Sequence, residues 1–435
     1  MSEIQELKEK ANSLRASKQF SEALSIYELL WGNHREICDE TDGWSYAVCL
    51  QKLGRHAEAL ALAEEILPLK PEYSNIRNVY CWSMYFLRVK VDRVTDEADF
   101  LDAALKITEN SRQQDKNYPY LYTVFKVLDY LDRKFPSDPE KMIEWTEKLD
   151  PTILEDAPQT ITLKDGKEKE FPSDKEKYYA FRTKALFEMG RLDECTALCD
   201  EALETIKVFH FDNDVWIRRR KAMVKAKQGD IPGAILLMQN VLKRKSDWMI
   251  RLDLAKLQLK IGEKRNAMLN CVEGALEHGD FEKKSSLFKF MAEMLEADNR
   301  TDDAKKHIAY AYTMRKEANL KPDDELMTLV GKYGIDVDTL YEGKRQAGAI
   351  RRLWEDIKYE DQEQLTGTIK SILPNGKAGF VESEPRKSYF FTRKDFKGKD
   401  EQFVPGTVVT FYLVDGFDTK KGIATRNAVN LRLIR

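Results

Sequence analysis

A pattern of polar turns and small residues repeats along about the first three hundred residues and constrains the fold more than any other feature. Segments such as KLGRHAEALALAEEIL, EMGRLDECTALCDEAL and KQGDIPGAILLMQNVL place a polar turn about five residues before a small residue in an apolar-periodic helix. These small residues are Ala23, Ala59, Cys195, Ala234, Ala267 and Ala304. Four of their intervals, 36, 39, 33 and 37 residues, predict one helical hairpin per repeat, and the remaining interval of 136 residues spans a region of poor pattern.

The pattern resembles the tetratricopeptide repeat, a helical hairpin with small residues at its eighth and twentieth positions. With the six residues above placed at position twenty, position eight falls on Ala11, Ala47, Ala222, Ala255 and Ala292. The resemblance predicts an α-solenoid over residues 1–320, with degenerate or elongated repeats at about 72–177. Residues 160–175 have little apolar periodicity, and we expect a loop between repeats there.

A solenoid of this kind leaves one concave helix face open, and such a face commonly binds a partner. In the family this face comes mainly from four positions of the first helix, which are mostly basic or soft apolar residues here. The candidate partner-binding residues are Lys177, Lys184, Trp216, Arg219, Met223, Lys256 and Lys289, together with Met249 and Glu293. They suit an unidentified protein or an acidic peptide, and a phosphate backbone is also compatible. The alternative is that these lysines only solvate exposed helices.

The first helix carries a further resemblance. Lys8 and Asn12 in ELKEKANSLRA match the pair with which co-chaperone tetratricopeptide domains clamp a carboxylate. The next repeat offers Ser45 where the clamp needs Asn, and the third repeat has no recognisable counterpart. We therefore favour a chance match.

The last seventy residues differ in composition from the rest. Although the whole chain has a formal net charge of −3, residues 365–435 hold 13 Lys and Arg against 7 Asp and Glu, and seven of the 21 Gly. Short β-rich runs, LTGTIKSIL, AGFVES, SYFFTR, TVVTFYLV and IATRNAVNL, predict a small closed barrel of five strands. The fold class is therefore multidomain: an α-solenoid of tetratricopeptide-like hairpins followed by this barrel.

TGTIKSILPNGKAGFV followed by SYFFTRKDF resembles the start of the cold-shock domain, an oligonucleotide-binding barrel. In that family outward aromatic rings stack on unpaired bases, and a basic rim follows the phosphates. The implied nucleic-acid-binding residues are Lys370, Lys377, Phe380, Phe390, Arg393, Lys394 and Phe403, with Arg386 and Lys387 nearby. Ser371, Ala378 and Thr392 stand where the family carries rings, so binding should be weaker than on a full platform. A barrel used for protein contact is the alternative.

Residues 321–364 form a helical linker or cap between the two modules. GKRQAGAIRRLWEDIKY predicts a basic amphipathic helix with Ile350, Leu353, Trp354 and Ile357 on one side. We expect this helix to dock onto the end of the solenoid. One Trp and three aliphatic residues bury too little area to favour a membrane-surface helix.

Enzymatic motifs are missing from the sequence. It contains no Walker loop, HExxH, GxSxG or CxxC in a supporting context, and we expect neither a metal nor another cofactor. Cys195 and Cys199 coincide with packing positions of one helix, so core thiols are favoured over metal ligands. Arg300 and His307 have a spacing that some helical ribonucleases use, but about one such match is expected by chance.

The sequence thus predicts a cytoplasmic, non-enzymatic adaptor. The solenoid would bind a protein partner and the barrel single-stranded RNA or DNA. The alternatives are a scaffold in which both modules bind protein and, less favoured, a helical ribonuclease. The charged N-terminus, six dispersed Cys and the lack of a long apolar run favour a reducing cytosol over export or the membrane.

Overall fold

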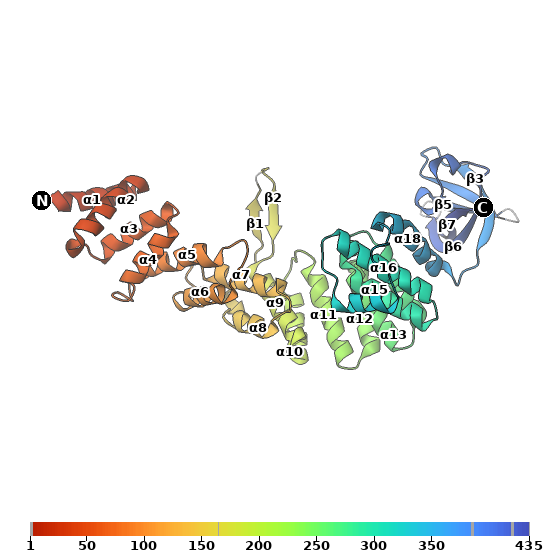
Figure 1. Ribbon diagram of the computed structural model, residues 1–435, viewed down its shortest axis with the longest axis horizontal. Coiled ribbons are helices and arrows are strands. Elements are labelled where there is room, and N and C mark those ends of the chain that lie inside the picture. The colour runs from red at the N-terminus through yellow and green to blue at the C-terminus, as the bar shows by residue number, and fades with distance from the viewer. Residues whose placement is uncertain (1–2, 164, 384–386, 419–421, 435) are drawn as a thin grey trace. The chain divides into compact units, whose positions relative to one another are not determined.

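The computed structural model describes residues 3–163, 165–383, 387–418 and 422–434 (Figure 1). The chain divides into two compact units, Met1–Ala234 and Ile235–Arg435. The helices that lie in the first unit are α1 (Glu3–Ala16), α2 (Phe20–Asn33), α3 (Glu40–Lys52), α4 (His56–Ile66), α5 (Ser74–Met84), α6 (Glu97–Glu109), α7 (Tyr120–Arg133), α8 (Pro139–Glu147), α9 (Asp174–Glu188), α10 (Leu192–Thr205) and α11 (Asn213–Lys227). The unit boundary falls within α12 (Ile231–Arg244).

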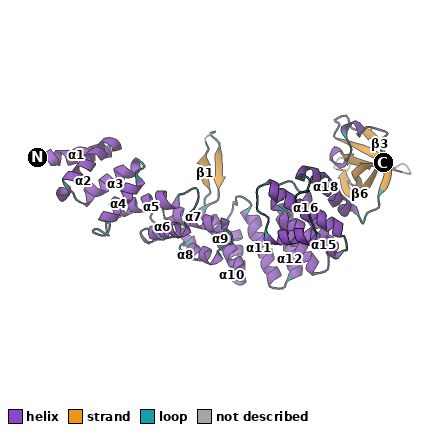
Figure 2. Cartoon of the chain, in the orientation of Figure 1, coloured by secondary structure: helices purple, strands orange, loops and turns teal. Residues whose placement is uncertain are grey.

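The second unit combines helices with a barrel. Its helices are α13 (Trp248–Lys260), α14 (Lys264–Leu276), α15 (Ser285–Ala297), α16 (Thr301–Glu317), α17 (Asp324–Lys332) and α18 (Gly343–Tyr359). Its strands are β3 (Leu365–Ile372), β4 (Ala378–Ser383), β5 (Lys387–Thr392), β6 (Val408–Asp418) and β7 (Ile423–Leu433). Within the described residues, Figure 2 shows strands only in this barrel and in one hairpin of the first unit.

The small residues lie where paired helices approach most closely. All eleven residues that the repeat places at positions eight and twenty are buried, with at most 1% of their surface exposed. Consecutive helices such as α1 and α2, α3 and α4, α13 and α14, and α15 and α16 pack as hairpins. The predicted tetratricopeptide-like helical solenoid is therefore confirmed.

A left-handed turn residue precedes each of the small residues at position twenty by five residues. The backbone φ is positive at Lys18, Gly54, Gly190, Gly229, Gly262 and Asn299. A residue with a Cβ is strained in this conformation, whereas Gly adopts it freely. The turn between the two helices of a repeat thus has the same left-handed residue in all six repeats, and this residue is Gly in four of them.

The segment 160–175 is not the irregular loop that its polarity predicts. Two strands, β1 (Gln159–Thr162) and β2 (Glu168–Phe171), pair as an antiparallel hairpin, and α9 begins at Asp174. Gly166 in the turn has a φ of +80°, and Asp-Gly is a frequent hairpin dipeptide. Because nearly all the side chains of both strands are exposed, the hairpin lacks the alternation of apolar and polar residues by which strands are recognised.

The five strands predicted for the C-terminal module are all present. They close into a barrel in the order β3-β4-β5-β7-β6, with β5 and β7 parallel and the other neighbours antiparallel. Alternate residues fill the barrel: Ile369, Val381, Phe391, Phe396, Val409, Phe411, Ala428 and Leu431 are buried. This interior fixes which side chains of β4 and β5 face outward.

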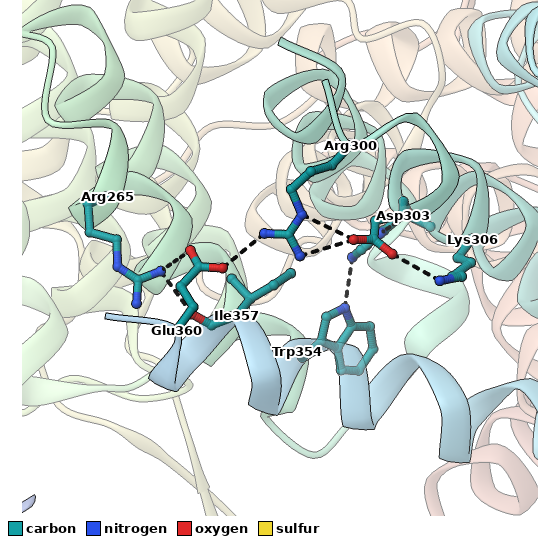
Figure 3. Close-up of polar contacts among 8 residues, drawn as sticks. Arg265, Arg300, Asp303, Lys306, Trp354, Ile357 and Glu360 are labelled. Carbon is teal, nitrogen blue, oxygen red and sulfur yellow. Dashed lines mark hydrogen bonds and ion pairs between the residues drawn. The ribbon is translucent and has the colours of Figure 1, made fainter. Parts of the chain in front are cut away.

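Helix α18 packs against α14 and α16 through the apolar side that its sequence predicts. Ile350, Trp354 and Ile357 are buried, and the Trp354 ring stacks on Phe288 at 5.6 Å. At the end of α18, Arg265 donates to the carbonyl of Ile357 at 2.8 Å, as Figure 3 shows. The helix therefore covers the end of the helical stack in this unit.

Replacement of Gly190 by Ala tests the left-handed turn. A Cβ at this position would meet no heavy atom within 4 Å, so the effect comes from the backbone alone. We expect a loss of about 1–2 kcal/mol in the free energy of unfolding, measured as a lower urea midpoint by circular dichroism. Gly32→Ala, in the exposed end of α2 where φ is not positive, is the matched control and should not destabilise.

Candidate nucleic-acid interface

Phe380 and Phe390 lie side by side on the outer surface of the barrel. Phe380 of β4 pairs with Phe390 of β5, and their ring centroids are 5.8 Å apart in an edge-to-face arrangement. Their neighbours Val381 and Phe391 are completely buried, and the alternation of a strand therefore directs the two rings outward. Both rings are half-buried, which leaves part of each accessible to a ligand.

The row of outward positions continues on both sides of the ring pair. Ser371 of β3 lies opposite Phe380, and Asn427 of β7 lies opposite Phe390. Ser371, at which the resemblance to the cold-shock domain leads one to expect a ring, thus lies directly beside the ring pair. The aromatic surface formed by Phe380 and Phe390 is narrow, and polar residues flank it.

The lysines around the ring pair differ in how they are held. Lys370 pairs with Glu382 at 2.7 Å and also lies 3.3 Å from the Ser388 hydroxyl. Lys377, Lys387 and Lys394 have exposed side chains. Arg386 lies outside the described residues. Lys370 is exposed as well, but its ammonium is already paired, so the other three lysines are better placed to contact a phosphate.

Arg393 and Phe403 are used within the barrel itself. The Arg393 guanidinium lies 5.0 Å from the centre of the Phe403 ring and pairs with Asp400. Phe403 in turn contacts the core rings Phe391 and Phe396. The loop before β6 thus packs one part of the half-buried Phe403 ring against the barrel core, and its role in base stacking stays a prediction.

The helical part of the second unit contacts the barrel at other places. Tyr359 at the end of α18 stacks on Tyr412 of β6 at 4.9 Å. Glu355 of α18 pairs with Lys397 at 2.8 Å and with Arg432 of β7 at 3.4 Å. Since these contacts involve β6, β7 and the segment after β5, they leave the outward rings of β4 and β5 open.

The five candidate partner-binding residues of the first unit lie on α9 and α11. Lys177 bonds to Asp174 at 3.0 Å, and Lys184 pairs with Asp132 at 2.6 Å. Arg219 lies over the ring of Trp216 at 5.8 Å. Trp216, Arg219 and Met223 are half-buried. The two lysines are thus held by carboxylates of the same unit.

The four candidates of the second unit differ in exposure. Lys256 is exposed and lies 5.7 Å from the centre of the Phe290 ring. Lys289 is only 8% exposed and pairs with Asp323, at 3.0 Å, and with Glu325. Its assignment to an open face is corrected, because α17 brings two carboxylates over it. Met249 is half-buried, and Glu293 borders a cavity of about 110 Å³.

The residues that match the carboxylate clamp make internal contacts. Lys8 pairs with Asp42 at 2.6 Å and donates to the carbonyl of Ile37. The bond to Asp42 raises the pKa of Lys8 above its ordinary value. The amide oxygen of Asn12 accepts a hydrogen bond from the Tyr27 hydroxyl at 2.9 Å. These contacts explain both residues structurally, in agreement with the chance match favoured above.

Arg300 and His307 form part of the α18 docking site. Arg300 pairs with Asp303 at 3.0 Å and with Glu360 at 2.9 Å (Figure 3). The indole N–H of Trp354 donates to Nε2 of the completely buried His307 at 2.9 Å. The other nitrogen, Nδ1, therefore carries the proton and donates to the Asp303 carbonyl at 2.8 Å. Both ring nitrogens are used to hold helices together.

Sequence reasoning missed an aromatic cavity of about 670 Å³ in the first unit. It lies in the region 72–177, where the repeats are degenerate. The rings that border it are Tyr85, Tyr118, Tyr120, Tyr122 and Phe125. The signal available in the sequence was the density of tyrosines in NYPYLYTVF, which reads equally well as helix packing.

The described residues offer neither a membrane-spanning helix nor a cluster of metal ligands. They contain no helix with the length and apolar character needed to cross a bilayer. No group of three or more His, Cys, Asp and Glu among them could hold a metal ion. Cys195 and Cys199 are buried with their sulfur atoms 4.0 Å apart.

No protein-family model and no curated protein matches the sequence. Among solved structures, the human IFIT1 dimer with PPP-AAAA is 14% identical, covers 81% of this chain and 82% of its own, and has a TM-score of 0.39. A tetratricopeptide repeat protein from Parabacteroides merdae is 12% identical over 77% of this chain and 99% of its own, with a TM-score of 0.30. The assignment of the fold rests on the buried small residues and the closed barrel described above.

Acid should weaken the docking of α18 through His307. Burial lowers the pKa of this imidazole to about 4, and protonation of Nε2 would oppose the Trp354 N–H. Because the pKa is lower in the folded state, the stabilisation is complete above about pH 6.5 and is lost as the pH falls toward 4. The full effect is on the order of 3 kcal/mol.

The measurement is the urea midpoint followed by Trp fluorescence between pH 7 and pH 4. The His307→Gln variant lacks this titration, and its midpoint should fall less steeply than that of the wild type. If the urea midpoints of the two proteins fell equally steeply with pH, the titration would not come from His307.

Proposed function

We propose that this chain is a non-enzymatic adaptor that binds single-stranded RNA or DNA on its C-terminal barrel and a protein partner on its helical solenoid. The observation that carries the nucleic-acid part is the outward ring pair of Phe380 and Phe390 beside exposed lysines. Stacking on an aromatic ring contributes about 1–3 kcal/mol per base. Two rings and a basic rim are the elements with which barrels of this size bind unpaired strands.

The arrangement of the barrel supports a cold-shock-like identity for this module. The first three strands form a meander, and the closing pairs are β3 with β6 and β5 with β7. Ser371, Phe380 and Phe390 occupy neighbouring outward positions on these first three strands, where the sequence resemblance places the base-stacking surface. The preference for unpaired strands follows, because stacking needs bases whose faces are free.

The solenoid supports the protein-binding part of the proposal. Stacked helical hairpins contact mainly their neighbours, and the open face of such a stack is a common interaction surface. Catalysis by Arg300 and His307 is not part of the proposal, because His307 is buried and uses both ring nitrogens internally. A protein-only scaffold is the competing function, and it predicts no binding of oligonucleotides.

Fluorescence anisotropy of a labelled oligothymidylate or oligouridylate with the full-length protein tests the ring pair. We expect the double variant Phe380→Ala/Phe390→Ala to bind at least tenfold more weakly, given about 1–3 kcal/mol per stacked base. Phe135→Ala, which removes a 96% exposed ring from the first unit, is the matched control and should bind as the wild type does. Absence of wild-type binding at low salt would favour the protein-only scaffold.

The lysines make a separate prediction on salt dependence. Each phosphate neutralised on a single strand contributes about −0.7 to the slope of log K against log salt concentration. The variant Lys377→Gln/Lys394→Gln should therefore have a shallower slope, by about 0.7 for each lysine that contacts a phosphate. Lys52→Gln, which changes an exposed lysine of α3 outside both candidate sites, should leave the slope unchanged.

A further inference from the structure

The aromatic cavity of the first unit has walls that are held in place. The Tyr118 hydroxyl donates to the Ser74 carbonyl and the Tyr120 hydroxyl to the Lys148 carbonyl, each at 2.7 Å. Tyr85 is buried, whereas Tyr122 is 63% exposed, and their ring centroids are 6.3 Å apart. The cavity therefore offers fixed aromatic surfaces to a ligand, with Tyr122 at its open side.

The charged residues that border the cavity carry more negative than positive charge. They comprise four carboxylates and three lysines. Lys126 donates to the carbonyl of Val91 at 3.1 Å, and Lys177 is held by Asp174 at 3.0 Å. Two of the three lysines that border the cavity are therefore held by other groups of the same unit.

Glu155 and Asp129 are the two carboxylates whose side chains lack such a contact among the described residues, and of these two Asp129 is the one on a helix. It lies one helical turn after Phe125 on α7, and it has no hydrogen bond or ion pair with any residue in the described part of the chain. Its side chain is exposed, although neighbouring protein atoms remove part of its hydration. This desolvation raises the pKa of Asp129 above its ordinary value, despite the positive charges of Arg133 and Lys177. A cation beside it would relieve the cost of the desolvated charge.

The cavity already contains one example of a cation held in this way. The Lys177 ammonium lies 5.2 Å from the centre of the Phe125 ring. It bonds to Asp174 and, at 3.3 Å, to the Gln159 amide oxygen. An aromatic face and a carboxylate together bind a cation by cation–π attraction and charge pairing. Asp129 and the tyrosines of the same cavity offer the same two kinds of group, and no described cation forms an ion pair with Asp129.

We propose that this cavity binds an arginine or lysine side chain of the partner polypeptide, with the cationic group against the tyrosine rings and paired with Asp129. The proposal rests on the function proposed above in one respect, namely that the solenoid binds a protein. At this cavity we therefore expect a basic partner segment and not an acidic one. An acidic peptide or a phosphate would lie against the carboxylates of Asp129 and Glu155 and be repelled. The guanidinium of arginine suits the site best, since it stacks on rings and pairs with carboxylates at once.

Isothermal titration of the full-length protein with short Gly-Ser peptides provides the first test. The peptides differ only in one central residue, which is arginine, lysine, citrulline or glutamate. We expect the arginine and lysine peptides to bind at least tenfold more tightly than the citrulline and glutamate peptides. Equal affinity for arginine and citrulline, or preference for glutamate, would overturn the proposal. Equal affinity for the arginine peptide and for free N-acetylarginine amide would also overturn the proposal, because the cavity would then be a site for a small cation.

Variants at the cavity provide the second test. Asp129→Asn should weaken binding of the arginine peptide at least tenfold and leave binding of the citrulline peptide unchanged. Tyr122→Ala should weaken it as well, whereas Tyr122→Phe should preserve it. Tyr122 is 63% exposed, so we expect an unchanged circular dichroism spectrum for both variants. Asp102→Asn, which removes an exposed carboxylate of α6 away from the cavity, is the charge-matched control. Unchanged affinity in Asp129→Asn would refute the assignment.

A competition experiment separates this proposal from the function of the barrel. Oligothymidylate should not displace the arginine peptide, and Phe380→Ala/Phe390→Ala should bind the peptide normally. Displacement by the oligonucleotide would assign the cavity to nucleic acid and overturn the proposal. If the peptide binds while the oligonucleotide does not, the barrel function fails and the cavity assignment stands.

Discussion

Close packing of helices at small residues is the constraint on which the helical structure depends. Ten alanines and Cys195 occupy these positions, and all of them are buried between the paired helices. Each hairpin packs mainly on its neighbours, so the same contact must recur from repeat to repeat. Where the helical stack of the second unit ends, Trp354 and the isoleucines of α18 bury the apolar surface of α14 and α16 instead.

Local properties of the sequence were sufficient to predict this architecture. Residue size at two positions per repeat predicted the buried contacts, short β-rich runs predicted the five strands, and the resemblance to the cold-shock domain implied the outward position of Phe380 and Phe390. The β1–β2 hairpin could not be found from periodicity, because neither of its faces is apolar. Its only local signal was the Asp165-Gly166 dipeptide.

Contacts between distant segments determine how two of the candidate site residues, Lys289 and Phe403, are held. Lys289 was placed on an open face, but Asp323 and Glu325 follow it by more than thirty residues and cover it in the fold. Phe403 lies in a loop, and only closure of that loop directs its ring toward Phe391 and Phe396. Charge and aromatic character alone do not distinguish a residue that binds a ligand from one that holds its own chain.

The aromatic cavity occurs where the repeat pattern is weakest, and the two facts have one physical cause. In a regular repeat, small residues let the helices close and leave no space between them. In the region 72–177 a π-helical turn (Tyr85–Val89) and a long connection before α7 replace that arrangement, and tyrosines line the space that remains. A departure from the pattern that would otherwise only destabilise the stack thereby creates a shaped surface. In a solenoid, such departures are the places where specificity for a partner can arise without loss of the repeated contacts on either side.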